Sequence, residues 1–142
     1  MTIAAILSDK GKEVVSVDGA TTVGAAVMLL AERRIGAVPV MEGGAIAGIF
    51  SERDVIRCFA SRGPTVFDAP VREVMTAPAL TVAPGDAVLA ALSLMTKRRF
   101  RHLPVVEGGA LVGFVSIGDL VKHRIDRIEA EAQAMRTYIQ QV

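Results

Sequence analysis

The sequence has little of the chemistry that marks disulfide-rich, zinc-binding or nucleic-acid-binding proteins. Its 142 residues contain a single cysteine, Cys58, which excludes an internal disulfide and a cysteine zinc cluster. Tryptophan is absent and aromatic residues reach only 4%, so few side chains could stack on bases. The 16 basic and 15 acidic residues nearly cancel, and no global field favours DNA or a lipid surface. We therefore expect no nucleic-acid partner.

Long hydrophobic runs are missing as well. The longest purely apolar stretch, Ala25 to Ala31, is far shorter than the roughly 20 residues that span a bilayer. Residues 1–10 carry no basic segment ahead of their short apolar stretch, and Asp9 comes too early for a secretory signal. These features predict a cytoplasmic protein without a membrane partner.

What the sequence does contain is one pattern written twice. A shift of 65 positions aligns residues 17–59 with residues 82–124 without a gap. The identical pairs include Val23 with Val88, Arg33-Arg34 with Arg98-Arg99, Pro39-Val40 with Pro104-Val105, Glu42 to Ala45 with Glu107 to Ala110, Gly48 with Gly113, Ser51 with Ser116, and Asp54 with Asp119. Chance does not produce such agreement, so the chain is an internal duplication.

Each copy has the periodicities of a β-α-β-β-α unit. A Gly-Gly pair separates the last two strands of each unit and favours a two-residue primed turn. The predicted elements are extended stretches at 14–17 and 79–82, helices started by Thr21 and Asp86, hairpin strands at 37–41, 45–50, 103–106 and 110–115, and a closing helix in each copy. Because a unit of about 45 residues has too small a core to fold alone, the two copies must pack together.

The predicted fold class is α/β (α+β), organised as one compact module. We assign residues 1–62 to the first repeat and residues 63–124 to a linker and the second repeat. Residues 125–142 extend the last helix. The turn residues at 61–65 form the linker, and Asp68-Ala69-Pro70 predicts a short helix through Met75.

The duplicated motifs together resemble the cystathionine-β-synthase (CBS) domain. They are the strands Ile-Gly-Ala-Val-Pro-Val and Phe-Arg-His-Leu-Pro-Val, the hairpin glycines, and the closing Ser-Glu-Arg-Asp and Ser-Ile-Gly-Asp. The resemblance implies two repeats related by a pseudo-twofold axis, often called a Bateman module, with two symmetry-related clefts. In the family these clefts hold AMP, ADP, ATP, NAD(H) or S-adenosylmethionine, and the module regulates an enzyme, channel or transporter.

The Ser-x-x-Asp motif at Ser51 and Ser116 has two interpretations. It can form a capping box, in which the third-position carboxylate reaches back to the cap N–H. Capping boxes favour the longer Glu or Gln, however, so we expect the shorter Asp54 and Asp119 to stay free for a ligand. A helix amino terminus and a serine hydroxyl suit phosphate, and an acceptor-only carboxylate suits the two ribose hydroxyls.

The resemblance implies that each cleft combines residues of both repeats. Cleft one would comprise Ser51, Arg53, Asp54, Thr76, Leu80, Phe100, Arg101 and His102, leading into Pro104. Cleft two would comprise Ser116, Asp119, Lys10, Val15, Ile35, Gly36 and Ala37, leading into Pro39.

The two clefts differ in charge. Arg53 is matched by Gly118, and Arg101 by Gly36, so cleft one is the basic one and should take the ligand with more phosphate charge. Binding in only one cleft is an alternative. The runs Arg33-Arg34 and Lys97-Arg98-Arg99 are interpreted as solvated cations at helix carboxyl ends.

The last helix carries a heptad pattern. From Asp119 onward there is no Pro or Gly, and the apolar residues alternate spacings of four and three. These residues are Val121, Ile125, Ile128, Ala132, Met135, Ile139 and Val142. We expect the helix to project from the module and pair with its own copy in a homodimer; packing back on the same module is the alternative.

The sequence thus predicts a stand-alone sensor of adenine nucleotides (AMP, ADP, ATP or NAD(H)) that acts on an unidentified effector protein. A ligand-free structural or partner-binding dimer is the alternative. No nucleophile and base pair, metal-ligand set or phosphate-binding P-loop is evident, and neither His102 nor His123 has a metal-ligand cluster around it. We therefore expect no enzymatic activity, no metal and no catalytic cofactor.

Overall fold

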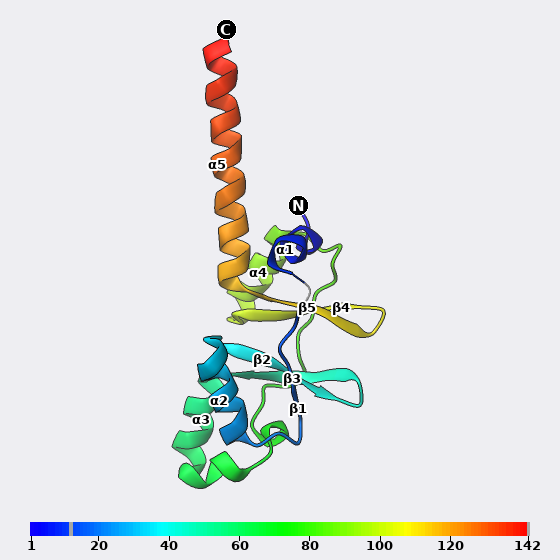
Figure 1. Ribbon diagram of the computed structural model, residues 1–142, viewed down its shortest axis with the longest axis vertical. Helices are drawn as coiled ribbons and strands as arrows, with labels where there is room; N and C mark the ends of the chain where they lie inside the picture. Colours follow the sequence, from blue (N-terminus) through cyan, green and yellow to red (C-terminus); the bar gives the residue numbers. More distant parts are fainter. Residues whose placement is uncertain (12, 142) are drawn as a thin grey trace.

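A computed structural model describes residues 1–11 and 13–141 and contains the two predicted copies. The first copy consists of β1 (Val17–Asp18), α2 (Val23–Arg33), β2 (Ala37–Glu42), β3 (Ala45–Ser51) and α3 (Glu52–Arg62). The second consists of α4 (Val88–Arg98), β4 (His102–Glu107), β5 (Ala110–Ser116) and α5 (Ile117–Gln141). The copies stack with β3 against β5, and α5 projects from the stack (Figure 1). The predicted mixed α/β duplication with a long last helix is confirmed.

Both hairpins form as expected. β2 and β3 pair antiparallel, as do β4 and β5, and each pairing has an irregularity at the equivalent position, Val40/Met41 and Val105/Val106. Gly43 and Gly44 have φ of 60° and 78°, and Gly108 and Gly109 have φ of 59° and 79°. Positive φ at both central residues defines the primed turn that matches the twist of the strands.

The opening strands are shorter than predicted. β1 pairs in parallel with β2 over Val17 and Asp18 only, and in the second copy Val82 makes a single parallel bridge to Val105. The first copy therefore has a sheet of order β1-β2-β3, and the second has a two-stranded sheet. A local turn follows each of these short pairings: Asp18 accepts from the Ala20 N–H, and Asp86 accepts from the Ala83 N–H.

The predicted helix starts are wrong by one residue. α2 is capped by Thr22, whose Oγ1 accepts the Ala25 N–H at 3.1 Å, and α4 begins after Ala87. Asp86 is engaged in the turn with Ala83 and so does not cap α4. The short helix expected through Met75 is replaced by two 3-10 helices, η1 (Pro64–Asp68) and η2 (Val71–Glu73).

An unpredicted helix, α1 (Ile3–Lys10), completes the core of the second copy. Ile3 and Ile6 are buried in the same cluster as Met95 and Leu103. The first copy is completed in the equivalent way, since its core includes Val66 and Val71 of the linker. Each copy therefore takes core side chains from the segment that precedes the other.

Equivalent backbone hydrogen bonds fix these exchanged segments. The Ile3 N–H donates to the Asp86 carbonyl at 2.9 Å, and the Val71 N–H donates to the Thr21 carbonyl at 2.7 Å. The linker then runs along the free edge of β3, where Thr76 and Ile49 exchange two backbone bonds. Gly48 makes this approach possible, because a Cβ there would lie 2.6 Å from the Thr76 carbonyl oxygen.

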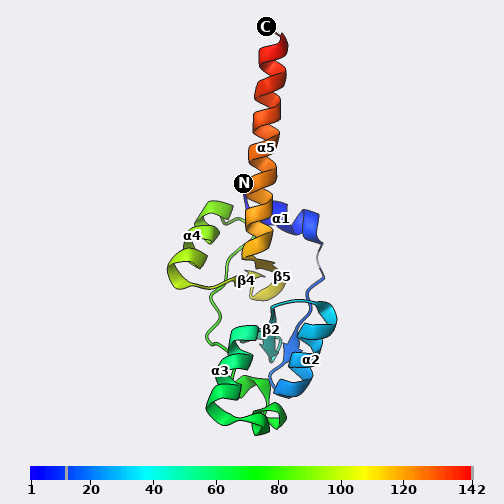
Figure 2. The ribbon, with the colours of Figure 1, turned by 90° about the vertical axis from the view of Figure 1, so that its left-hand side faces the viewer.

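α5 leaves the module after its first turns. Leu120 is fully buried, whereas every residue from 125 to 141 is at least partly exposed and most are fully open to solvent. The side view also shows α5 extending away from the module (Figure 2). The predicted projection of this helix is confirmed; Val142, the last residue of the heptad pattern, lies outside the described residues. Among the residues that the structure describes, no helix combines the length and the apolarity needed to cross a bilayer.

The exchanged core predicts a large effect for Ile3→Ala. Truncation of this fully buried side chain should lower the free energy of unfolding by about 2–5 kcal/mol, since it removes apolar contacts and leaves a cavity. Urea denaturation followed by circular dichroism measures the change. Ile56→Ala is the matched control, because Ile56 is 71% exposed on α3. Equal, small effects of both substitutions would show that α1 is not part of the core.

Candidate functional site

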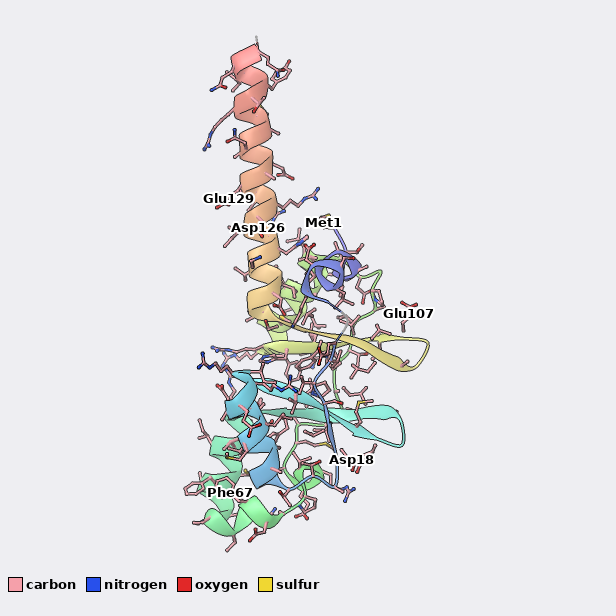
Figure 3. All side chains as sticks on the ribbon, in the orientation of Figure 1. Met1, Asp18, Phe67, Glu107, Asp126 and Glu129 are labelled. Atoms are coloured by element: carbon pink, nitrogen blue, oxygen red, sulfur yellow. The ribbon has the colours of Figure 1, made fainter. Side chains whose placement is uncertain are left out.

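A cavity of about 510 Å³ lies between the two copies, where the start of α3 meets the segment leading into β4. Nitrogen-tipped side chains gather at this level of the stack (Figure 3). The lining residues are Gly36, Ile49, Ser51, Glu52, Arg53, Asp54, Arg57, Thr76, Pro78, Ala79, Leu80, Arg98, Arg99, Phe100, Arg101, His102, Ser116 and Ile117. The cavity is composite, with walls from both repeats.

The cavity brings together most residues predicted for cleft one. Those that line it are Ser51, Arg53, Asp54, Thr76, Leu80, Phe100, Arg101 and His102. Pro104 does not line it, because it is buried within β4 and paired with Phe114 of β5. Two residues predicted for cleft two, Gly36 and Ser116, line this cavity as well.

Hydrogen bonds between the repeats hold the walls in place. Arg53 Nη1 donates to the Arg99 carbonyl at 3.4 Å, which links the start of α3 to the end of α4. Within each repeat, the first N–H of the closing helix binds the chain ahead of the hairpin: Glu52 N–H to the Gly36 carbonyl, and Ile117 N–H to the Arg101 carbonyl. Because the Glu52 N–H already donates to the Gly36 carbonyl, a phosphate at the start of α3 would have to bind other donors.

Asp54 is not free, which corrects the expectation that a shorter acid would leave the capping box. Its side chain is 1% exposed. Oδ2 accepts from the Ser51 N–H at 2.8 Å and from Ser51 Oγ at 3.1 Å, and Oδ1 accepts from Thr76 Oγ1 at 2.9 Å and Arg57 Nη1 at 3.1 Å. Asp54 therefore closes a capping box and joins α3 to the linker. The Ser51–Asp54 motif therefore lies at the cavity, and the acceptor sites of the Asp54 carboxylate are already occupied.

Asp119 is engaged in a parallel way with a different partner. Its Oδ2 accepts the Ser116 N–H at 2.8 Å and forms an ion pair of 2.7 Å with Lys10 Nζ. Lys10 also donates to the Phe114 carbonyl at 2.8 Å. Asp54 pairs with Arg57 of its own helix and with the neutral Thr76 of the linker, whereas Asp119 pairs with Lys10, a cation on the exchanged segment α1. Lys10 thus occupies the acid on which cleft two was predicted to depend.

The remaining residues predicted for cleft two lie outside the 510 Å³ cavity. Ala37 and Pro39 are buried within β2, and Val15 and Ile35 pack against the core of the first copy. None of them, nor Lys10 or Asp119, lines the 510 Å³ cavity.

Two titratable groups at the interface have shifted pKa values. Burial lowers the pKa of His102, and the nearby Lys10 charge lowers it further, so the imidazole is held neutral. Its ring stacks on Phe114, with centroids 5.5 Å apart. Burial alone would raise the pKa of Asp119, but the bonds from Lys10 and Ser116 outweigh burial and lower it.

Sequence reasoning missed the role of Arg98 and Arg99. Both line the cavity, whereas their sequence pattern indicates solvated cations at the end of α4. Arg99 has φ of 58° and Arg34, its equivalent, has φ of 53°, so both end their helices in the left-handed conformation. Of these two helix ends, the end of α4 at Arg99 lines the cavity, and the end of α2 at Arg34 does not. The one available signal was that Phe100–His102, the residues directly after Arg99, were predicted to line cleft one.

Metal ligation finds no support in the described chain. Over residues 1–11 and 13–141, no three His, Cys, Asp or Glu side chains are placed to hold an ion. Cys58 is a buried free thiol within α3, as its place in a helical pattern indicated.

The ion pair predicts that Lys10→Met raises the pKa of Asp119. In the intact protein a depressed pKa contributes stability above the unfolded value of about 3.9, and this contribution is lost as the pH falls through the folded value. Without Lys10, the pKa of Asp119 in the folded protein rises, so its contribution to stability above about pH 3.9 becomes smaller. Carboxyl carbon NMR measures the titration, with Lys97→Met on α4 as control. An Asp119 pKa that does not respond would contradict the ion pair.

Comparison with known proteins agrees with this architecture. The sequence matches the CBS domain family over residues 7–61 and again over residues 71–126. A mitochondrial CBS domain-containing protein of Arabidopsis thaliana is 36% identical over 151 residues, which cover 98% of this chain and 72% of the relative.

Solved structures with CBS domains are similar over nearly the whole module. A protein from Burkholderia ambifaria has 41% identity and a TM-score of 0.83, covering 89% of this chain and 95% of its own. A protein from Agrobacterium tumefaciens has 36% identity and a TM-score of 0.84, covering 87% and 99%. Proteins built from such pairs are regulatory modules. This chain belongs to the CBS-domain family and carries a tandem pair of the repeats.

Proposed function

We propose that the chain is a sensor that binds an adenosine-containing nucleotide (AMP, ADP, ATP or NAD(H)) in the cavity between its repeats. The supporting observation is the composition of the cavity wall. Five arginines, Arg53, Arg57, Arg98, Arg99 and Arg101, face two acids, Glu52 and Asp54. Guanidinium groups bind phosphate oxygens in bidentate fashion, so this wall suits a ligand with one or more phosphates.

The rest of the cavity suits a nucleoside. Its volume of about 510 Å³ falls within the roughly 300–1,000 Å³ typical of small-molecule sites. Ile49, Leu80 and Phe100 supply apolar surface on which a base can lie. Two proteins that share the fold at 23% and 20% identity were crystallised with AMP, and with 5-methylthioadenosine and S-adenosyl-L-methionine. The fold itself therefore accommodates adenosyl compounds.

Ribose binding by Asp54 requires an exchange of hydrogen-bond partners. Arg57 is the partner most easily released, because its side chain is 69% exposed and its bond to Asp54 Oδ1 is 3.1 Å. A ribose hydroxyl that replaces this bond leaves the Arg57 guanidinium free to turn toward phosphate. In the second repeat the equivalent exchange would have to break the shorter Lys10 ion pair of 2.7 Å, whose lysine is only 41% exposed, so we propose that the basic cavity is the site filled first.

The signal leaves the module through α5. Ser116 and Ile117 belong to the cavity wall and lie at the start of this helix. A ligand changes an equilibrium only if it binds one arrangement better than another, and these two residues are where such a difference could reach α5. We propose that α5 pairs with α5 of a second copy, and that the homodimer acts on a separate effector protein in the cytoplasm.

Paired substitutions at equivalent helix ends test nucleotide binding. Arg99→Ala should weaken binding by about 1–3 kcal/mol, because a charged hydrogen bond to phosphate is lost. Arg34→Ala is the matched control: it has the same left-handed backbone but does not line the cavity. Titration calorimetry with AMP, ADP, ATP and NADH measures both. No heat with any of the four at millimolar concentration, or equal losses in both variants, would refute the proposal.

A second pair of substitutions tests the dimer. Ile128→Glu places a charge in the apolar stripe of α5 and should convert the dimer to monomer in sedimentation equilibrium. Ala130→Glu lies two residues away on the opposite side of the helix and should leave the dimer intact. A dimer that survives both substitutions would mean that α5 is not the contact.

A further inference from the structure

The free part of α5 presents a continuous apolar stripe, here called the α5 seam. It consists of Val121, Ile125, Ile128, Ala132, Met135 and Ile139. The large members are 42% to 64% exposed, and within the described chain no other element covers residues 125–141. Beyond Glu129, the side chains of α5 stand clear of both repeats (Figure 3). Such a stripe on a helix of 25 residues has the form of one strand of a coiled coil.

The spacing assigns each residue a heptad position. Ile125, Ala132 and Ile139 take position a, and Val121, Ile128 and Met135 take position d. The flanking e positions are then Lys122, Glu129 and Arg136, and the g positions are Arg124, Glu131 and Tyr138. The sign of charge alternates along both flanks, so the charges discriminate between ways of pairing two helices.

In a parallel, in-register pair, each g residue faces the e residue of the next heptad on the other helix. Arg124 then faces Glu129 of the second copy, and Glu131 faces Arg136 of the second copy. Symmetry repeats both contacts, so every charged g-to-e contact that the described helix can make is attractive.

An antiparallel pair with full overlap has the opposite outcome. Val121 would then pack near Ile139 of the second copy, and e residues would face e residues while g residues face g residues. Glu129 and Glu131 would each meet their own copy, and Lys122 would meet Arg136. All of these contacts join like charges.

Shifted antiparallel registers remove the repulsion but are opposed by the folded module or lose overlap. A shift of one heptad toward the module pairs Lys122 with Glu129 and Arg124 with Glu131, but it carries residues 137–141 of the second copy past the start of α5 at Ile117, where α1 and α4 pack against this helix. A shift of one heptad away from the module leaves Val121 without a partner and retains only the Glu129 and Arg136 contacts.

We infer that two copies of the chain associate through the α5 seam in a parallel, in-register coiled coil. In this arrangement the CBS pairs of both copies lie at the same end of the coiled coil. The inference rests on the proposed pairing of α5 with a second copy and adds its orientation. The two can fail separately, since a pair of opposite orientation would still be a pair.

Disulfide formation measures the orientation directly. Cys58→Ser leaves the chain without cysteine, and Ile139→Cys then adds one at a seam position. In the parallel pair the two introduced sulfurs meet and should form a covalent dimer in high yield under mild oxidation. In the antiparallel pair they lie about 27 Å apart and cannot. Thr137→Cys, on the outer side of the helix, is the control and should stay largely monomeric on a non-reducing gel.

A mixture of Val121→Cys and Ile139→Cys chains, both in the Cys58→Ser background, covers the other orientation. A disulfide that joins the thiol introduced at position 121 to the one introduced at position 139, identified by mass spectrometry, would overturn the parallel arrangement but leave the pairing of α5 intact. A sedimenting dimer that forms no disulfide in either experiment would overturn the parallel, in-register pair and leave a shifted antiparallel pair or a contact outside α5. A monomer at all concentrations would overturn the pairing and the orientation together.

A charge exchange adds a second readout in the full chain. Arg136→Glu places a carboxylate opposite Glu131 of the second copy twice per dimer and should raise the dimer dissociation constant by roughly tenfold. Adding Glu131→Lys restores opposite charges in the parallel pair and should recover most of the affinity. In a shifted antiparallel pair the carboxylate introduced at position 136 would still meet Glu129, so failure of the double variant to recover would contradict the parallel register.

Discussion

Neither CBS repeat of this chain can fill its own core, and the rest of the structure follows from that constraint. The short sheets and their two helices leave one side of each core open. α1 closes the second core with Ile3 and Ile6, and the linker closes the first with Val66 and Val71. Because the two segments are exchanged, the repeats cannot separate without exposing both cores. The cavity between them therefore has fixed walls, although it is built from residues far apart in sequence.

The same exchange explains which parts of the fold could be predicted. Hairpins and helices within a repeat depend on local signals, such as the Gly43-Gly44 turn and the apolar period of α2, and these were predicted correctly. α1 was missed because it is short, its Thr2 cap makes no side-chain bond, and its apolar face is matched only by residues about eighty positions later or more. The opening strands were overestimated, since only Val17 and Asp18 of the first copy and Val82 of the second pair with a neighbouring strand.

The wall of the cavity was predicted in outline, but the contacts of its acids were not. Eight residues of the first predicted cleft line one cavity, and their role in binding stays a prediction. The engagement of Asp54 with Thr76, and of Asp119 with Lys10, depends on side chains delivered by the exchanged segments. No local pattern encodes such contacts. They give the two motif acids different partners, so a symmetric sequence duplication yields two chemically unequal halves.

The continuity of α5 has a mechanical consequence. One unbroken helix starts at the cavity wall, with Ser116 just before it and Ile117 opening its first turn, and ends at Gln141. Its 25 residues correspond to a rod of about 37 Å. Tilting that rod by about 5° at its base moves its tip by about 3 Å, comparable to the width of a side chain. A helix of this length therefore converts a small change of angle at the cavity wall into a much larger displacement at its far end.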